Sequence, residues 1–255
     1  AEILPITALP QANGLLEMGR YCAVILGSVS GGVVLSLWSE RPFAIGLLLM
    51  GIASVGFATG LGIPHVPRSG ADKRFRFNPF AEVAVGLQRL GKDVALRSIV
   101  VGTTYFDFLG ALVLLDMILV GKEVTHIDDG QIGMLAAFAG VGIGIGSMAS
   151  GRIAQGENAI GLVAFAALGA AFGLLGLSTA TSSYIASASL MAAIGFCGGL
   201  AAVPLNAALQ RKARGTERGL VISTNNFLNM SGVLLASGVL WLLREGVGIG
   251  PGAIL

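Results

Sequence analysis

Long apolar segments decide what this chain can fold into. A helix that crosses a bilayer needs about 20 mostly apolar residues to span roughly 30 Å of hydrocarbon. Four segments meet this requirement and contain no charged residue: 21–38, 42–63, 130–151 and 219–243. A fifth segment, 98–120, is apolar except for Asp107 and Asp116. Residues 158–209 carry no charge over a length that suits two crossings, joined by a turn at the polar cluster 178–183. The sequence therefore predicts seven spans.

Composition excludes the main alternatives to a helical membrane protein. Hydrophobic residues make up 54% of the chain and charged residues 12%, whereas soluble domains carry about 25% charged residues. Strands of a membrane barrel alternate apolar and polar residues, and segments such as 45–50 (IGLLLM) do not alternate. We therefore expect an all-α membrane protein. In such a protein many of the 39 glycines, including Gly140, Gly142, Gly144 and Gly146, are best explained as close packing faces between helices.

Nothing in the sequence indicates catalysis, a cofactor or nucleic-acid binding. The net charge is only +2, so the chain has no broad cationic face for nucleic acid. Cys22 and Cys197 lie apart in apolar runs, and His65 and His126 are solitary, so no metal site is expected. No nucleophile, base and acid set is visible. We expect a protein that is not an enzyme and that needs no cofactor.

The positions of Lys and Arg predict orientation and domain division. These residues accumulate in cytoplasmic loops. If the spans alternate, most of the 16 lie on one side, whereas only Arg41, Lys122 and Arg244 lie on the other. The long basic connection 64–97 is predicted to be a cytoplasmic linker. Residues 1–63 then hold two spans that end an N-terminal bundle, and 98–255 hold five spans and the start of a sixth in a C-terminal bundle.

Many secondary transporters consist of two six-helix halves joined by such a linker. In that arrangement this chain covers about helices 5 to 11 plus the start of helix 12. It begins at Ala1 without a methionine and stops at Leu255, where a new apolar segment begins. We therefore expect it to be an internal piece of a longer carrier.

Several blocks of sequence carry a resemblance to a known family. The blocks are LPQANGLLEMG (9–19) running into AVILGSVSGG (23–32), GIGIGS (142–147) continuing to Gly151 and Arg152, VPLNAALQ (203–210), and RGLVISTNNFLN (218–229). Together they resemble the bacterial lysophospholipid transporters of the major facilitator superfamily. The sequence departs from that family at Asp107, where the family tends to place an aromatic residue.

The resemblance implies a major facilitator helical bundle that moves lysophospholipids such as lysophosphatidylethanolamine across the bacterial inner membrane. It implies membrane lipids as surroundings and reacylation of the lipid as the following step in phospholipid remodelling. Some relatives are fused to an acyltransferase and an acyl-carrier-protein synthetase, so such an enzyme is a possible partner in cis or in trans. An exporter of other small amphipathic compounds, or the membrane domain of a fused acyltransferase, remain the alternative hypotheses.

Polar residues within the spans are the candidates for substrate binding. An ionisable side chain in a span costs about 2.5–3.5 kcal/mol on insertion scales, so it usually faces a cavity or a partner. Asp107 lies near mid-membrane and is the leading candidate for an amine-bearing headgroup or a coupling cation; a structural carboxyl is the alternative. Asp116 is expected near the outer surface, more as a rim residue than as a ligand.

Asn225 and Asn229 share a helix face, with Asn226 beside them, so they suit either a phosphate or glycerol hydroxyl or interhelical hydrogen bonds. For Asn206 and Gln210, at the inner end of a span, a structural role is favoured. Glu17 and Arg20 are predicted to pair with each other at the inner end of the first span. Together with Arg152 they are expected to form a cytoplasmic gate.

Overall fold

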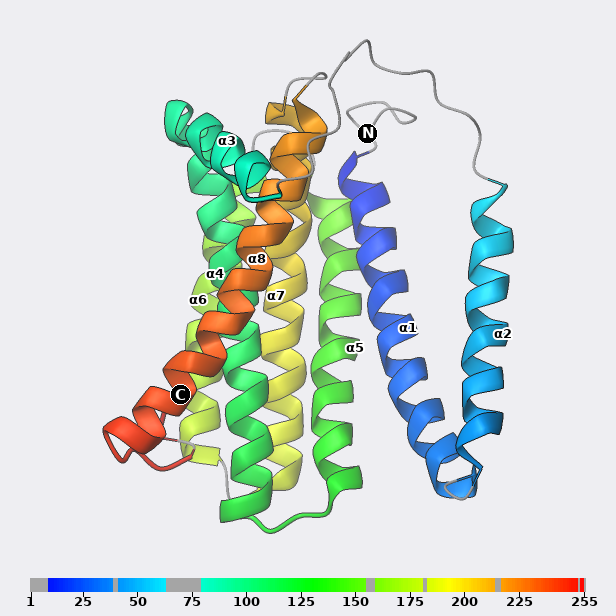
Figure 1. Cartoon of the computed structure of the whole chain (residues 1–255). Coiled ribbons are helices and arrows are strands. Elements are labelled where there is room, and N and C mark those ends of the chain that lie inside the picture. The colour runs from blue at the N-terminus through cyan, green and yellow to red at the C-terminus, as the bar shows by residue number, and fades with distance from the viewer. Residues whose placement is uncertain are drawn as a thin grey trace. The chain divides into compact units, whose positions relative to one another are not determined.

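The structure is a computed structural model that describes residues 9–38, 41–62, 79–154, 159–180, 183–213, 217–251, 253 and 254. Its elements are α1 (Leu9–Trp38), α2 (Pro42–Gly60), α3 (Pro79–Lys92), α4 (Val94–Leu119), η2 (Val120–Val124), α5 (Asp129–Ile153), α6 (Ala159–Ala180), α7 (Tyr184–Lys212), α8 (Arg218–Trp241) and η4 (Leu242–Gly246) (Figure 1). The elements η2 and η4 are single π-helical turns. Every element within the described ranges is helical, which confirms the all-α prediction.

Six of these helices are long and apolar enough to cross a membrane. They are Pro42–Gly60, Val94–Val124, Gly130–Ile153, Ala159–Ala180, Tyr184–Lys212 and Arg218–Gly246. They coincide with the second to seventh predicted spans. The first predicted span, 21–38, is helical as part of α1, but several of its side chains lie outside the described residues.

The chain divides into two compact units. One contains Ala1–Cys22 together with Arg74–Leu255, and the other contains Ala23–Lys73. In the second unit α2 begins with Pro42, whose fixed φ suits the first turn of a helix, and none of its residues is buried. The predicted bundles 1–63 and 98–255, separated by the linker 64–97, remain a prediction about the domain organisation.

The closest helix packing in the first unit is between α5 and α7, and glycine makes it possible. A Cβ atom on Gly142 would lie 2.0 Å from the carbonyl oxygen of Ala192, and one on Gly146 would lie 2.1 Å from that of Phe196. From the other side, a Cβ on Gly195 would lie 2.2 Å from the carbonyl oxygen of Ala139. Any side chain at these positions would push the backbones apart. The predicted packing role of the glycine series is therefore confirmed for Gly142 and Gly146.

The charge-free stretch 158–209 forms two helices, as predicted. α6 ends at Ala180, and the side chain of Ser183 caps α7 by accepting a hydrogen bond from the Ala186 N–H at 3.4 Å. Thr181 and Ser182, in the predicted turn, lie outside the described residues. α6 packs through small buried residues such as Ala166 and leaves large apolar side chains exposed, among them Phe172 at 72%, which suits a helix that borders lipid.

The inner end of the first unit is the end at which α3 lies beside the start of α4, the last turn of α7 and the first turn of α8. A buried apolar cluster joins them, formed by Leu90, Leu96, Val100, Leu209, Ala213 and Val221. Asp93 separates α3 from α4 and caps α4, because its carboxylate accepts a hydrogen bond from the Leu96 N–H at 3.1 Å. This bond holds the pKa of Asp93 below its ordinary value. At the opposite, outer end Arg244 of η4 binds Glu123 of η2 at 2.7 Å.

The connection 64–97, predicted to be a basic cytoplasmic linker, contains α3. The predicted linker residues 64–78 lie outside the described part of the chain.

Candidate functional site

Charged side chains of α1 interact electrostatically with a carboxylate of α4. Glu17 and Arg20 are one helical turn apart on α1, and Arg20 Nη1 lies 3.7 Å from Glu17 Oε2. The Arg20 guanidinium also lies 5.0 Å from the ring centre of Tyr21 and donates a hydrogen bond of 3.4 Å from Nη2 to the Tyr21 hydroxyl. Asp107 of α4 is half-buried and interacts electrostatically with both Arg20 and Glu17. We call Glu17, Arg20 and Asp107 the charge cluster.

Asp107 lies at the middle of α4, and Glu17 and Arg20 lie in the first half of α1. Asp107 is midway between Val94 and Leu119, the two ends of α4. On α1, Met18 is next to Glu17 and contacts the middle part of α5, since a Cβ on Gly144 would lie 3.8 Å from Met18 Cγ. Arg20 is roughly three turns into α1 at about 3.6 residues per turn. Glu17 and Arg20, expected at the inner end of the first span, lie within α1, which begins at Leu9. Their role in a cytoplasmic gate stays a prediction.

The inner end of α1 packs directly on α5 and α7. A Cβ on Gly14 would lie 2.7 Å from the Ser147 carbonyl oxygen and 3.3 Å from Cα of Gly151. Gln210 Nε2 of α7 donates a hydrogen bond of 3.0 Å to Asn13 Oδ1. We call these five residues the inner contact. Arg152 follows Gly151 in the last turn of α5 and is exposed.

The inner contact buries polar groups that it does not satisfy. Asn13 is 7% exposed and Ser147 is fully buried. Among the described residues, neither Asn13 Nδ2 nor Ser147 Oγ has a hydrogen-bond partner. Sequence analysis did not single out Asn13, Gly14 or Ser147. The available signals were an Asn-Gly pair at the start of an apolar helix and a serine within a glycine series.

The predicted asparagines do not join the charge cluster. Thr103 Oγ1 of α4 lies 2.7 Å from Asn225 Oδ1 of α8, and both residues are buried. One residue further along α4, Thr104 Oγ1 lies 3.0 Å from Asn229 Oδ1. Asn226 is exposed. Of the two interpretations left open by the sequence, these contacts match interhelical hydrogen bonding between α4 and α8.

Asp116, expected close to the outer surface as a rim residue, lies in the last turn of α4 and its side chain is fully buried. Its role as a rim residue stays a prediction. Beyond α4 the chain continues through η2. A Cβ on Gly121 of η2 would lie 2.7 Å from the side chain of Ile132 and 3.5 Å from that of Ile127, so η2 packs closely against these two side chains.

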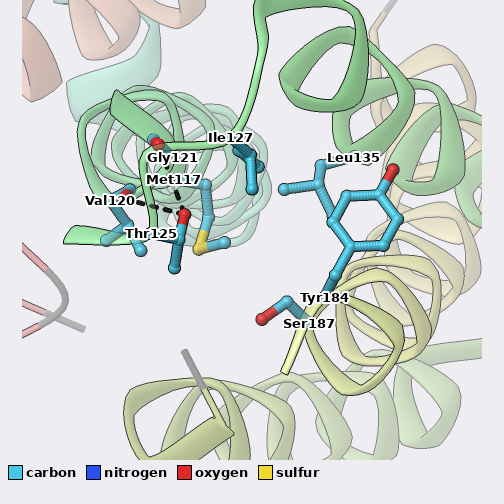
Figure 2. A pocket seen from close by; sticks show the side chains of 8 residues that line it. All are labelled: Met117, Val120, Gly121, Thr125, Ile127, Leu135, Tyr184 and Ser187. Carbon is cyan, nitrogen blue, oxygen red and sulfur yellow. Dashed lines mark hydrogen bonds between the residues drawn. The ribbon is translucent and has the colours of Figure 1, made fainter. Parts of the chain in front are cut away.

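The outer end also encloses a small cavity of about 130 Å³, shown in Figure 2. It is lined by Met117, Val120, Gly121, Thr125, Ile127, Leu135, Tyr184 and Ser187. The hydroxyls of Thr125 and Tyr184 lie 3.3 Å and 3.2 Å from the backbone carbonyls of Gly121 and Gln131. Sites for drug-sized ligands are typically 300–1,000 Å³. The cavity is smaller than such sites, and the hydroxyls of Thr125 and Tyr184 are already paired, so we do not assign the substrate site to it.

Comparison with known proteins gives the family. The sequence model described as Major Facilitator Superfamily matches residues 1–237. Three proteins named lysophospholipid transporter LplT are similar to the chain. The one from Enterobacter sp. (strain 638) is 31% identical, covering 96% of this chain and 63% of the relative. The one from Klebsiella pneumoniae (strain 342) is 28% identical, covering 96% and 61%, and the one from Serratia proteamaculans (strain 568) is 28% identical, covering 93% and 59%.

The chain therefore spans about three fifths of the length of these relatives, from 59% to 63%. No solved structure matches it. The names of the relatives confirm the resemblance seen in the sequence blocks, and the match of the family model to most of the chain is decisive. This chain belongs to the Major Facilitator Superfamily.

Proposed function

We propose that the protein moves lysophospholipids across the bacterial inner membrane by alternating access, with the charge cluster as the headgroup site. The observation that carries this proposal is the electrostatic interaction of Asp107, in the middle of α4, with Arg20 and Glu17 of α1. Ionisable groups at this depth are costly and usually mark a transport pathway. The names of the relatives in the family supply the lipid class.

The charges of the cluster suit a zwitterionic headgroup. Lysophosphatidylethanolamine carries a phosphate anion and an ammonium cation. The Arg20 guanidinium can bind phosphate oxygens in a bidentate manner, and the Asp107 carboxylate can bind the ammonium group. A single such contact at 4 Å provides about 4 kcal/mol at an effective dielectric constant of 20. With two acidic groups and one basic group, the cluster retains a carboxyl for the amine when Arg20 turns to the phosphate.

Arg20 is reachable by a substrate. Its side chain is 61% exposed, while that of Glu17 is 19% exposed. An arginine facing lipid at this depth would cost about 2.5–3.5 kcal/mol or more. We therefore infer that Arg20 faces a polar cavity of the complete carrier, where the mobile guanidinium exchanges Glu17 for a lipid phosphate.

The inner contact is our proposed cytoplasmic gate, with Arg152 at its edge. Its close glycine packing and its one hydrogen bond favour the closed arrangement. Its unsatisfied polar group Asn13 Nδ2 opposes that arrangement by about 1–3 kcal/mol, since water satisfies it once α1 moves away. Stabilising contacts and an unsatisfied buried group with free energies of similar size suit a contact that must open and close in each transport cycle.

Headgroup specificity tests the site. The complete protein in lipid vesicles should accelerate uptake of labelled lysophosphatidylethanolamine and lysophosphatidylglycerol. Asp107→Asn should slow the ethanolamine lipid and spare the glycerol lipid, because only the former carries an ammonium group. Arg20→Gln should slow both, because both carry phosphate. Arg97→Gln and Glu245→Gln remove exposed charges away from the site and should leave both rates unchanged.

The outcomes separate the lipid proposal from the site proposal. If the unsubstituted protein accelerates neither lipid, the lipid substrate is wrong, and export of other amphipathic compounds or a role as the membrane domain of an acyltransferase gains support. If transport occurs but Asp107→Asn and Arg20→Gln behave like the two controls, the charge cluster is not the headgroup site. Gel filtration of each variant checks that the loss of a charge has not unfolded the protein.

A further inference from the structure

Helix α7 contains a proline among its membrane-spanning residues. Pro204 lies inside the helix, in its inner half. Proline has no backbone N–H, so the carbonyl oxygen of Leu200, four residues earlier, cannot form the usual hydrogen bond within the helix. Leu200 is 4% exposed, so its surroundings are protein rather than water. A buried carbonyl without a donor is costly in a membrane interior, and the Leu200 oxygen therefore needs a donor from outside its own helix.

Ser150 of α5 supplies the missing donor. Its Oγ donates a hydrogen bond of 2.9 Å to the Leu200 carbonyl oxygen. Ser150 is fully buried, so this bond is shielded from water. The hydroxyl of one helix thereby takes the place of the backbone N–H that the other helix lacks.

The direction of the Ser150 hydroxyl differs from that of other helical serines in the described ranges. A serine inside a helix often donates to the carbonyl four residues earlier in its own helix. Ser98, Ser189 and Ser231 all do so. Ser150 instead donates across to α7, to the carbonyl that Pro204 leaves free. The serine and the proline on neighbouring helices are therefore matched to each other.

Pro204 divides α7 into two parts, which we call the outer segment (184–203) and the inner segment (205–212). The outer segment is fixed to α5 by direct backbone contact, since a Cβ on Gly199 would lie 2.2 Å from the Ile143 carbonyl oxygen. Backbone packing of this kind leaves the outer segment little freedom to move relative to α5.

The inner segment has neighbours other than α5. Leu205 lies against α4, where a Cβ on Gly102 would lie 3.4 Å from Leu205 Cδ2. Leu209 is 2% exposed and belongs to the apolar cluster at the inner end, formed with residues of α3, α4 and α8. Gln210 donates its hydrogen bond to Asn13 of α1. Without a fixed junction between the two segments, the inner segment would follow these neighbours rather than α5.

We propose that Ser150 is a positioning residue for the inner contact. By pairing with the Leu200 carbonyl it holds the inner segment at a fixed angle to the outer segment, so that Gln210 keeps its place beside Asn13. Pro204 alone would make α7 a helix that bends freely, whereas Pro204 together with Ser150 makes the shape of α7 depend on α5. The inference goes beyond the transport proposal, since it depends neither on the substrate nor on whether the inner contact acts as a gate.

A pair of substitutions separates this role from ordinary packing. Ser150→Ala removes the donor, so the inner segment should gain freedom to bend. Pro204→Ala restores a backbone N–H at position 204, which donates to the same Leu200 carbonyl within the helix. Ser150→Ala should therefore have its effect only while Pro204 is present. The matched control is Ser189→Ala, because the Ser189 hydroxyl bonds within α7 itself.

Distances between spin labels measure the position of the inner segment. The complete protein, after Cys22→Ala and Cys197→Ala, carries one label at Arg211→Cys and a second at either Ile160→Cys, at the start of α6, or Lys92→Cys, at the end of α3. The three side chains to be labelled are exposed. The inner segment is about 12 Å long at about 1.5 Å per residue, so a change of about 20° in the bend of α7 moves its end by about 4 Å. Pulsed electron paramagnetic resonance resolves a shift or broadening of this size.

With Pro204 present, Ser150→Ala should shift or broaden the distance distribution of at least one label pair by about 2–4 Å. In the Pro204→Ala background the same substitution should leave both distributions unchanged, and Ser189→Ala should leave them unchanged in either background. Distances that Ser150→Ala does not alter would overturn the proposal. An alteration of the same size in both backgrounds would also overturn it, because Ser150 would then act through something other than the free carbonyl.

The same comparison holds if Ser150→Ala yields no folded protein while Pro204 is present. Gel filtration then measures the yield of folded protein instead of the label distances. Recovery of folded protein in the Pro204→Ala background supports the proposal. A second failure to fold, in a background where Pro204→Ala alone folds, overturns it.

Discussion

Replacement of Gly14 by alanine should hold the inner contact open. The added Cβ would lie 2.7 Å from the Ser147 carbonyl oxygen and 3.3 Å from Cα of Gly151. Both neighbours are backbone atoms, so no rotation of a side chain can relieve the clash, and α1 must move away from α5. Inserting a methyl group into a close-packed contact costs about 1–3 kcal/mol.

This penalty applies only while α1 is packed on α5. If the two helices separate during the transport cycle, Gly14→Ala should raise the population of the separated state by about 5- to 150-fold, the ratio that corresponds to 1–3 kcal/mol. The result expected for transport is slower turnover, because the inner side no longer closes fully.

The population can be followed through the reactivity of a buried thiol. Asn13 is 7% exposed and its side chain contacts Gln210 of α7, so Asn13→Cys, in a chain without Cys22 and Cys197, should react with a water-soluble maleimide only when α1 moves away. The labelling rate should rise with the open population when Gly14→Ala is added. The matched control is Gly19→Ala on the same helix, where a Cβ has nothing within 4 Å. Equal labelling rates in the two alanine variants would refute the proposed separation of α1 and α5.

Two further predictions concern the ends and the interior of α4. Asp93→Asn should lower the melting temperature. Because the hydrogen bond from the Leu96 N–H lowers the pKa of Asp93, the full difference in melting temperature should appear above the pKa of about 3.9 of an unfolded aspartate, and it should vanish as the pH falls through the lower folded pKa. A difference that does not change with pH would contradict this role. Thr103→Val should destabilise the protein by about 0.6–2 kcal/mol in a detergent unfolding titration, because Asn225 Oδ1 loses a buried hydrogen-bond partner. The control is Ser223→Ala, which should have little effect because the Ser223 hydroxyl bonds within its own helix. Equal losses of stability in the two variants would argue against the Thr103 contact.

The number and length of the spans could be predicted because the bilayer imposes a length on every crossing. Hydropathy needs no knowledge of neighbours, so α2 and α4 to α8 were found where the apolar segments lie. α3 escaped this method because it does not cross the membrane. Its apolar residues are interleaved with Arg89, Lys92 and Gln88, and a window average over such a segment resembles a polar linker.

The depth of charged residues was harder to predict. A hydropathy window ends where charges begin, so the first span was set to start after Arg20. The helix in fact starts at Leu9, and Glu17 and Arg20 lie inside it. These facts depend on which charges meet across helices, which one sequence does not contain.

The glycine contact between α5 and α7 has a mechanical consequence. Where side chains separate two helices, rotamer changes let one helix slide along the other by small steps. At Gly142, Gly146 and Gly195 the backbones themselves are in contact, and backbone atoms have no rotamers to change. A force that displaces α5, such as the departure of α1 from Ser147, should therefore displace α7 by the same amount. The two helices should move as one rigid body, so that Gln210 on α7 moves together with Ser147 on α5.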